Sequence, residues 1–148
     1  MEPIACGVQG VYITVTPRGN APTVLLKVRE GSFIPIYIGL WEAISIRNAM
    51  NNEVMPRPLT HDLMMDVLVR FTLAVDSLYI DALEDGVFYG KLMIRHNGQC
   101  EAVDCRPSDG IAIALRAQAP ILVDAEVIAH AAVSKDELQE LVDIQNFL

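Results

Sequence analysis

Residues 77–104 read SLYIDALEDGVFYGKLMIRHNGQCEAVD, and this stretch decides the fold. The pairs Asp85-Gly86 and Asn97-Gly98 divide it into three runs of strand-forming residues. Both pairs favour two-residue hairpin turns, because Asn, Asp and Gly tolerate the positive φ angles that such turns require. The stretch therefore predicts an antiparallel meander with strands at 77–83, 87–95 and 99–104.

Local patterns on both sides of the meander predict further strands and helices. Residues 17–20 (PRGN) are typical of a turn between two strands, and Pro35 in the next run indicates a sheet edge or a bulge. Ser134 and Glu137 form an S-x-x-E capping box, which predicts a helix over the apolar residues that follow. Strands are expected at 8–15, 23–28, 33–38 and 121–123, and helices at 41–50, 60–73, 107–118 and from Ser134 onward.

The order of these elements is typical of an α+β protein with a curved, mixed, mainly antiparallel sheet packed by helices. A chain of 148 residues suits one domain over residues 1–148, and a hydrophobic content of 52% is enough for a substantial core. The longest apolar run, residues 34–41, is broken by Pro and Gly, so no membrane partner is expected. The N-terminus carries Glu2 and no basic region, so no secretory signal is expected, and Cys6, Cys100 and Cys105 form no CxxC motif. We therefore expect a cytoplasmic protein with reduced, buried cysteines.

The net charge of −8 comes from one half of the chain. Residues 1–75 carry six basic and six acidic side chains, whereas residues 76–148 carry five basic and thirteen acidic ones. Such a protein gains little from the counterion release that dominates affinity for nucleic acids. The charge therefore argues against an extended nucleic-acid surface, but it allows a local site where a metal ion bridges carboxylates to phosphate.

Two similar phrases flank the meander: RPLTHD at 57–62 and DCRPSD at 104–109. Each has an arginine, a proline, a hydroxyl residue and a carboxylate, and each precedes an amphipathic run. Proline is pre-set for the first turn of a helix, so each phrase predicts a helix N-terminus. Helix N-termini collect unpaired N–H groups and partial positive charge, which suit anions. If the two ends meet, they form a polar site with two arginines and several carboxylates.

Each acidic or histidine residue of these phrases has a functional and a structural interpretation. Asp104 and Asp109 are candidate metal ligands or general bases, or else an arginine partner and a helix-capping residue. His61 is a candidate acid, base or metal ligand, or else a satisfied polar residue behind a Thr60 cap. His61 and Asp62 point about a quarter-turn apart on a helix, so they need not share a site.

The arginines have the same two interpretations. Arg57 and Arg106 are suited to hold a phosphate, or else they pair with nearby aspartates and lock two helix ends to the sheet. Glu42 is a candidate metal ligand or a residue that complements a helix dipole. The sequence contains no P-loop, dinucleotide fingerprint, HExxH or GxSxG motif. It also lacks a row of aromatic residues interleaved with basic ones, which single-strand binding platforms use.

Several motifs, in this order, resemble the bifunctional nuclease domain family. They are IPIYIG (34–39), EA (42–43), RPLTHDL (57–63), GVFY (86–89), DCRPSDGIA (104–112) and API (119–121). The resemblance implies a compact α+β domain that self-associates and, for some members, cleavage of both RNA and DNA. The family usually reads Asp-Ala-Arg-Pro-Ser-Asp-Ala, whereas this chain has Cys105 and Gly110 in place of the two alanines. Gly110 costs the helix on the order of 1 kcal/mol relative to Ala.

The leading hypothesis is a nuclease that hydrolyses phosphodiester bonds of RNA or DNA with little sequence specificity. In it, Asp62, Asp104 and Asp109 bind Mg²⁺ or Mn²⁺, which prefer oxygen ligands. The metal activates water and offsets phosphate charge, and His61 protonates the leaving oxygen. The expected catalytic residues are His61, Asp62, Arg57, Arg106 and Asp109, and the expected substrate-binding residues are Arg57, Arg106, Thr60 and Ser108.

Two other hypotheses belong to different functional classes. In the first, the protein is a non-catalytic binding or regulatory module that forms a homo-oligomer, with a dimer favoured. Its motif residues are then a structural ion-pair network, in agreement with the acidic charge and the missing basic groove. In the second, the two helix ends form a pocket for a small anion or metabolite.

Overall fold

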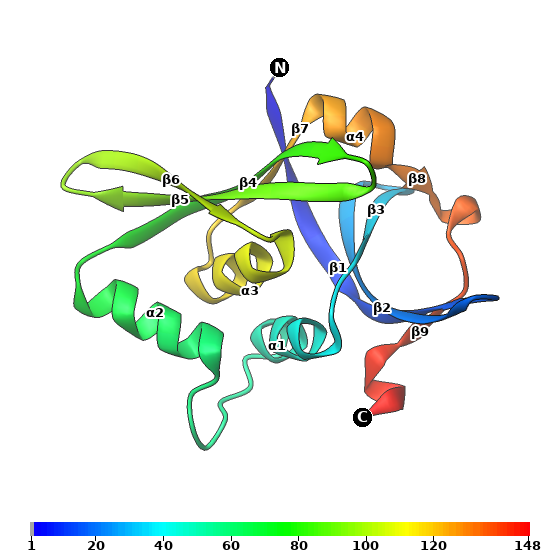
Figure 1. Cartoon of the computed structure of the whole chain (residues 1–148), viewed down its shortest axis with the longest axis horizontal. Helices are drawn as coiled ribbons and strands as arrows, with labels where there is room; N and C mark the ends of the chain where they lie inside the picture. The colour runs from blue at the N-terminus through cyan, green and yellow to red at the C-terminus, as the bar shows by residue number, and fades with distance from the viewer. Residues whose placement is uncertain (1) are drawn as a thin grey trace.

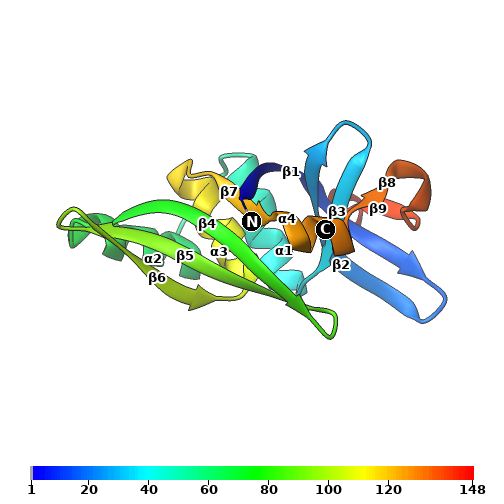
Figure 2. The same ribbon diagram turned by 90° about the horizontal axis from the view of Figure 1, so that it is seen from above.

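The computed structural model describes residues 2–148, and across them nine strands form one mixed sheet that is not closed (Figures 1 and 2). The strands are β1 (Pro3–Thr16), β2 (Gly19–Arg29), β3 (Ser32–Tyr37), β4 (Ala74–Glu84), β5 (Val87–His96), β6 (Gln99–Cys105), β7 (Ile121–Asp124), β8 (Val133–Ser134) and β9 (Leu141–Asp143). The helices are α1 (Leu40–Met50), α2 (Thr60–Arg70), α3 (Pro107–Ala117) and α4 (Ala125–Ala131), with 3₁₀ turns at Lys135–Glu137 and Ile144–Phe147.

The sheet has the order β6-β5-β4-β7-β1-β2-β3-β8, and β9 also pairs with β1. The pairing of β4 with β7 is parallel, and the other pairings are antiparallel. The long strand β1 joins the two halves: residues 3–6 pair with β7, and residues 7–16 pair with β2. The predicted α+β class with a mixed, mainly antiparallel sheet is confirmed.

The predicted meander is present as β4, β5 and β6. Asp85 and Gly86 have φ angles of 51° and 79°, and Asn97 and Gly98 have 51° and 78°. Two consecutive positive φ angles are the requirement of the type I′ hairpin turn, so the turn chemistry sets the register of both hairpins. The predicted edge at Pro35 is confirmed as well, because β8 covers only residues 32–33 of β3.

Helix α3 is the central helix of the protein. It packs against α1, α2, β4 and β5, and Figure 1 shows α1, α2 and α3 on one side of the meander. The α3 residues 110–114 are buried, together with Ile46 of α1 and Leu78 of β4. By contrast, α2 buries only Leu68. No helix among the described residues is long and apolar enough to cross a membrane.

The prediction of a helix after Ser134 is wrong. Ser134 N does donate to Glu137 Oε1 at 2.8 Å, but this bond closes only a 3₁₀ turn. Residues 141–143 instead pair with β1 as strand β9. A short helix has a costly nucleus, whereas the edge of β1 offers ready hydrogen bonds and burial. The sequence analysis also missed α4, which Asp124 caps by accepting a hydrogen bond from Glu126 N at 3.1 Å.

Smaller corrections concern α2 and the cysteines. The predicted 60–73 helix ends at Arg70, and its N-cap is Leu59 rather than Thr60. Pro107 is the first residue of α3 as predicted, but Pro58 lies just before α2. Cys6 is buried, Cys105 is half-buried, and Cys100 is exposed, contrary to the expectation. Burial raises the pKa of the Cys105 thiol to about 11.

The close packing at Gly110 yields a stability prediction. A Cβ there would overlap Leu78 Cδ1, which is fully buried, and would lie 3.1 Å from Cys105 Sγ. Overpacking costs about 1–3 kcal/mol and outweighs the helix propensity of alanine, about 1 kcal/mol. We expect Gly110→Ala to lower the free energy of unfolding by about 1 kcal/mol in urea titrations.

The double variant Cys105→Ala/Gly110→Ala is the control. Removal of Sγ gives Leu78 room to move, so the double variant should be more stable than the sum of the two single changes predicts. A Gly110→Ala protein more stable than wild type would contradict the packing described here.

Candidate functional site between α1, α2 and α3

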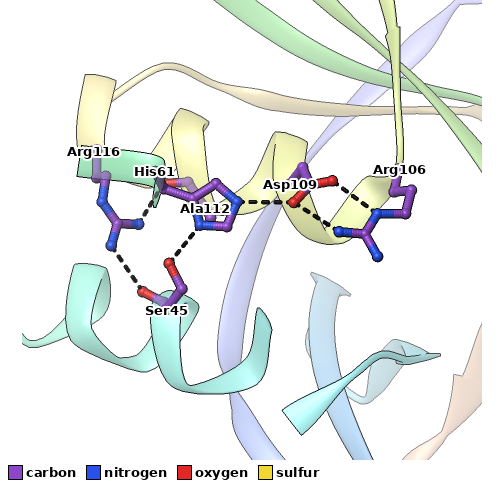
Figure 3. A network of polar contacts seen from close by, with 6 residues as sticks. All are labelled: Ser45, His61, Arg106, Asp109, Ala112 and Arg116. Carbon is purple, nitrogen blue, oxygen red and sulfur yellow. Dashed lines mark hydrogen bonds and ion pairs between the residues drawn. The ribbon is translucent and has the colours of Figure 1, made fainter. Parts of the chain in front are cut away.

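The fold brings the two Arg-Pro phrases together at the first turns of α2 and α3. His61 Nε2 lies 2.9 Å from Asp109 Oδ1. Arg106 donates from Nε to Asp109 Oδ2 at 2.8 Å and from Nη2 to Asp109 Oδ1 at 3.1 Å. The Asp109 carboxylate therefore lies between an imidazole and a guanidinium (Figure 3).

Ser45 of α1 adds a fourth residue to this row of polar contacts. Ser45 Oγ lies 2.6 Å from His61 Nδ1, so Ser45, His61, Asp109 and Arg106 form a continuous chain of polar contacts (Figure 3). Sequence reasoning missed Ser45, because a serine within a helix has no motif around it. One signal was present: Ser45 and Asn48 are polar residues three positions apart on the same helix face, and both are buried.

The order of the contacts determines which histidine nitrogen carries a proton. The ionised Asp109 carboxylate can only accept, so His61 Nε2 must carry a hydrogen. In a neutral ring Nδ1 then has a free lone pair, and the Ser45 hydroxyl donates to it. This is the arrangement in which an imidazole activates a hydroxyl group while a carboxylate holds the tautomer.

A second polar cluster fixes the same three helices from another side. Arg116 of α3 donates from Nε to Asp62 Oδ1 at 2.8 Å, from Nη1 to Ala112 O at 3.0 Å and from Nη2 to Ser45 O at 3.3 Å. Asp62 Oδ2 also accepts from Leu59 N at 3.0 Å. The sequence analysis did not foresee Arg116, which lies a full helix length from the Arg-Pro phrase.

Both aspartates have lowered pKa values. The hydrogen bond from Arg116 is the main cause for Asp62 and outweighs the opposing effect of burial on its pKa. Burial is the largest single influence on Asp109 and raises its pKa, but the hydrogen bonds and charges of Arg106 and His61 together outweigh it, so the pKa is lowered. Both carboxyl groups are therefore ionised at neutral pH.

The remaining predicted site residues lie apart from this row. Arg57 is exposed in the loop before α2, and none of the ion pairs among the described residues involves it. Asp104 is exposed and pairs with Lys91 at 3.2 Å rather than with an arginine. Thr60 and Ser108 each line one of the two hollows described below.

The three aspartates expected to share a metal ion do not form one donor set. Asp62 is held by Arg116, Asp104 by Lys91, and Asp109 by Arg106 and His61. Within residues 2–148, no three His, Cys, Asp or Glu side chains gather in an arrangement suited to a metal ion. The sequence hypothesis of an Asp62–Asp104–Asp109 site thus lacks support in the geometry.

Two hollows open beside the row. The larger, of about 580 Å³, is lined by Trp41, Glu42, Ile44, Ser45, Asn48, Met55, Pro58, Leu59, Thr60, His61, Arg106 and Asp109. The smaller, of about 430 Å³, is lined by residues 36–39, 86–88 and 106–108. Among the described residues, Arg106 is the one lining residue that the two hollows share. Both volumes fall in the range of small-molecule sites.

Comparison with known proteins supports the family resemblance that the two Arg-Pro phrases indicated. The family model of the bifunctional nuclease domain matches residues 24–136, which include both phrases. The chain belongs to the bifunctional nuclease domain family. An uncharacterized protein of Mycobacterium tuberculosis, Rv1829, is 38% identical over 125 residues, which cover 84% of this chain and 74% of that protein.

Plant members of the family are more distant. Bifunctional nuclease 1 of Oryza sativa subsp. japonica is 29% identical over 117 residues, which cover 74% of this chain and 35% of that protein. Bifunctional nuclease 1 of Arabidopsis thaliana is 25% identical over 108 residues, covering 70% and 33%. This chain thus corresponds to about a third of each plant protein.

The Arg116 cluster predicts a measurable contribution to stability. Arg116 is 11% exposed, so Arg116→Met should remove the hydrogen bonds that Asp62 Oδ1 and the carbonyl oxygens of Ala112 and Ser45 accept from it. We expect a loss of about 2 kcal/mol in the free energy of unfolding, less than for a fully buried pair because water reaches Asp62. The matched control is Arg70→Met, which breaks an exposed pair with Asp66 and should change stability by less than about 0.5 kcal/mol. Equal losses in the two variants would contradict this.

The lowered pKa of Asp109 predicts a pH dependence. A carboxyl group with a lower pKa in the folded state binds protons mainly after unfolding, so its contribution to stability is present above the unfolded pKa of about 3.9 and lost as pH falls further. We expect the stability difference between wild type and Asp109→Asn to stay constant from pH 7 to 5 and to shrink below about pH 4. Urea midpoints between pH 7 and 3 measure it, and an unchanged difference at pH 3 would speak against the contact.

Proposed function

We propose that this protein hydrolyses phosphodiester bonds of RNA or DNA, with little sequence specificity, at the larger hollow. The observation that carries the proposal is the row Ser45–His61–Asp109, whose residues line a hollow that Arg106 also lines. The membership in the bifunctional nuclease domain family supports it. So do the plant relatives named bifunctional nuclease.

The row suggests a role for His61 other than direct protonation of the leaving oxygen. Both ring nitrogens already have partners, so the ring reaches a substrate through Ser45. In the proposed first step, Ser45 Oγ forms a bond to phosphorus while its proton moves to His61 Nδ1, and the bond from phosphorus to the leaving oxygen breaks. His61 then passes this proton to the leaving oxygen. A water molecule, deprotonated by the same imidazole, then forms a bond to phosphorus as the bond from phosphorus to Ser45 Oγ breaks, and His61 returns the proton to Ser45 Oγ.

Charge in this scheme is balanced by the neighbours of the ring. The Asp109 carboxylate stabilises the imidazolium that forms, as the carboxylate does in a serine–histidine–aspartate triad. Arg106 is positioned to stabilise negative charge on the phosphoryl oxygens. No metal ion takes part in this scheme, because the three aspartates expected to bind one have separate partners. The assay compares Mg²⁺, Mn²⁺ and EDTA to test whether cleavage needs a metal ion.

A second candidate is a non-catalytic homodimeric module in which the same contacts are purely architectural. It is favoured by the fact that the row and the Arg116 cluster together tie α1, α2 and α3 to one another. It is also favoured by exposed apolar side chains on α2, namely Leu63, Met64, Val67 and Val69. In this case the protein owes its function to a partner surface rather than to chemistry.

Cleavage of labelled single-stranded RNA and DNA tests the first candidate. Highly purified wild type is assayed with Mg²⁺, Mn²⁺ or EDTA beside Ser45→Ala and Asp109→Asn. We expect both variants to lose at least about 100-fold in rate, because each breaks the row that activates the nucleophile. Asp66→Asn is the matched control, since Asp66 is an exposed aspartate of α2 outside the row, and it should cleave like wild type.

Melting temperatures of the same proteins separate the two candidates. The nuclease proposal expects Asp109→Asn to remain folded and inactive. If wild type cleaves no faster than Asp109→Asn, and Arg106→Ala dissociates or unfolds the protein, the architectural candidate replaces it.

A further inference from the structure

The smaller hollow has no role in the chemistry proposed above, although Arg106 connects it to the larger one. Its walls are mainly apolar and include two aromatic residues, Tyr37 at the end of β3 and Phe88 of β5. The larger hollow has an aromatic residue of its own, Trp41, which is 76% exposed. Aromatic residues therefore line both hollows, and Arg106 lines both as well.

The hydrogen bonds of Arg106 leave one of its nitrogens available. Nε and Nη2 donate to Asp109, whereas Nη1 makes no hydrogen bond or ion pair with any residue in the described part of the chain. Arg106 itself is largely exposed. A phosphate oxygen placed at Nη1 would thus meet a charged donor whose orientation Asp109 already holds.

We propose that the two hollows are adjoining base subsites for one dinucleotide unit of single-stranded nucleic acid, with its phosphate at Arg106. One base lies against Trp41 in the larger hollow, and the neighbouring base lies against Tyr37 and Phe88 in the smaller one. This inference deepens the proposed function and rests on it for the class of ligand. Every base has a π-face, so stacking of this kind is tolerant of sequence.

The separation of the hollows selects against a duplex. Within residues 2–148 the two hollows share no lining residue except Arg106, so consecutive bases must leave their mutual stack to enter both. Unpaired strands allow bases to splay apart onto aromatic side chains, whereas paired and stacked bases in a duplex do not.

The charge of the site indicates that base stacking, rather than electrostatic attraction, is the main source of affinity for nucleic acid. Asp109 and Glu42 both lie near Arg106 and offset much of its charge, in a chain with a net charge of −8. Stacking must then provide most of the binding free energy. Neutralisation of one phosphate on a single strand gives a slope of roughly −0.7 when log K is plotted against log salt concentration. We expect a slope no steeper than this value.

Trp41 is the single tryptophan of the chain, so its fluorescence reports on the larger hollow. The probe is a dinucleotide of two 2′-deoxyadenosines joined by a phosphorothioate linkage, which slows cleavage, and it is titrated into the whole 148-residue chain. We expect saturable quenching. Analogues that lack either one of the two bases should bind at least about fivefold more weakly, because each base stacks separately. A duplex oligonucleotide should compete at least about tenfold less well than the same strand unpaired.

Two tyrosines provide a matched pair of variants. Tyr37 and Tyr89 are 58% and 40% exposed, so neither substitution should unfold the protein, and only Tyr37 lines the smaller hollow. We expect Tyr37→Ala to weaken dinucleotide binding about tenfold and Tyr89→Ala to leave it within about twofold. Melting temperatures of both variants confirm that they remain folded.

The outcomes separate this inference from the proposed function. Absence of saturable quenching, equal affinity for analogues with one base or two, or equal effects of the two tyrosine substitutions would overturn the base subsites. Cleavage activity together with any of these results would leave the nuclease proposal standing alone. Base-dependent binding without cleavage would support the subsites and count against hydrolysis.

Discussion

The contact between His61 and Asp109 is the interaction on which the rest of the site depends, because it joins the first turns of two helices that are 48 positions apart in the sequence. Helix α3 is held firmly by burial of residues 110–114 against the sheet. Helix α2 buries only Leu68, so apolar packing cannot fix its position well. Its attachment relies on polar contacts, made by His61 with Ser45 and Asp109 and by Asp62 with Arg116.

Because α2 is held by polar contacts rather than by burial, the stability of the protein depends on the same residues that form the site. The same side chains that hold α2 in place also form the row beside the larger hollow. A partly buried polar network is costly when one member is lost, because the remaining members keep their desolvation penalty without their partner. Catalytic and architectural roles for these residues are therefore compatible, and only measurements that report activity and stability side by side can separate them.

The two residues that differ from the usual family motif, Cys105 and Gly110, compensate each other in side-chain volume. The family usually has alanine at the two positions held here by Cys105 and Gly110. In this chain Cys105 Sγ lies 3.1 Å from the position that a Cβ on Gly110 would occupy, and Leu78 fills the rest of that space. A larger residue at the end of β6 thus accompanies a smaller one on α3, in agreement with the close packing of protein interiors. The polar residues of the motif are unaffected.

The sequence by itself determined the elements whose signals are local. Asp85-Gly86 and Asn97-Gly98 specified two hairpins through their φ preferences, and Pro107 placed the start of α3. The pair of Arg-Pro phrases identified the family and four of the interacting residues, which are His61, Asp62, Arg106 and Asp109. Local signals failed where pairing with a distant strand was more stable than a short helix, as in residues 141–143, which form β9 on β1.

Only the tertiary structure decided which side chains meet. Ser45 and Arg116 carry no motif, and they enter the site because α1 and α3 pack against each other. Asp104 belongs to the same two phrases as Asp62 and Asp109, but the register of β5 and β6 places it opposite Lys91, with which it pairs. Turn and helix signals are set by neighbouring residues along the chain, whereas a site between helices is set by long-range burial, which no short stretch of sequence encodes.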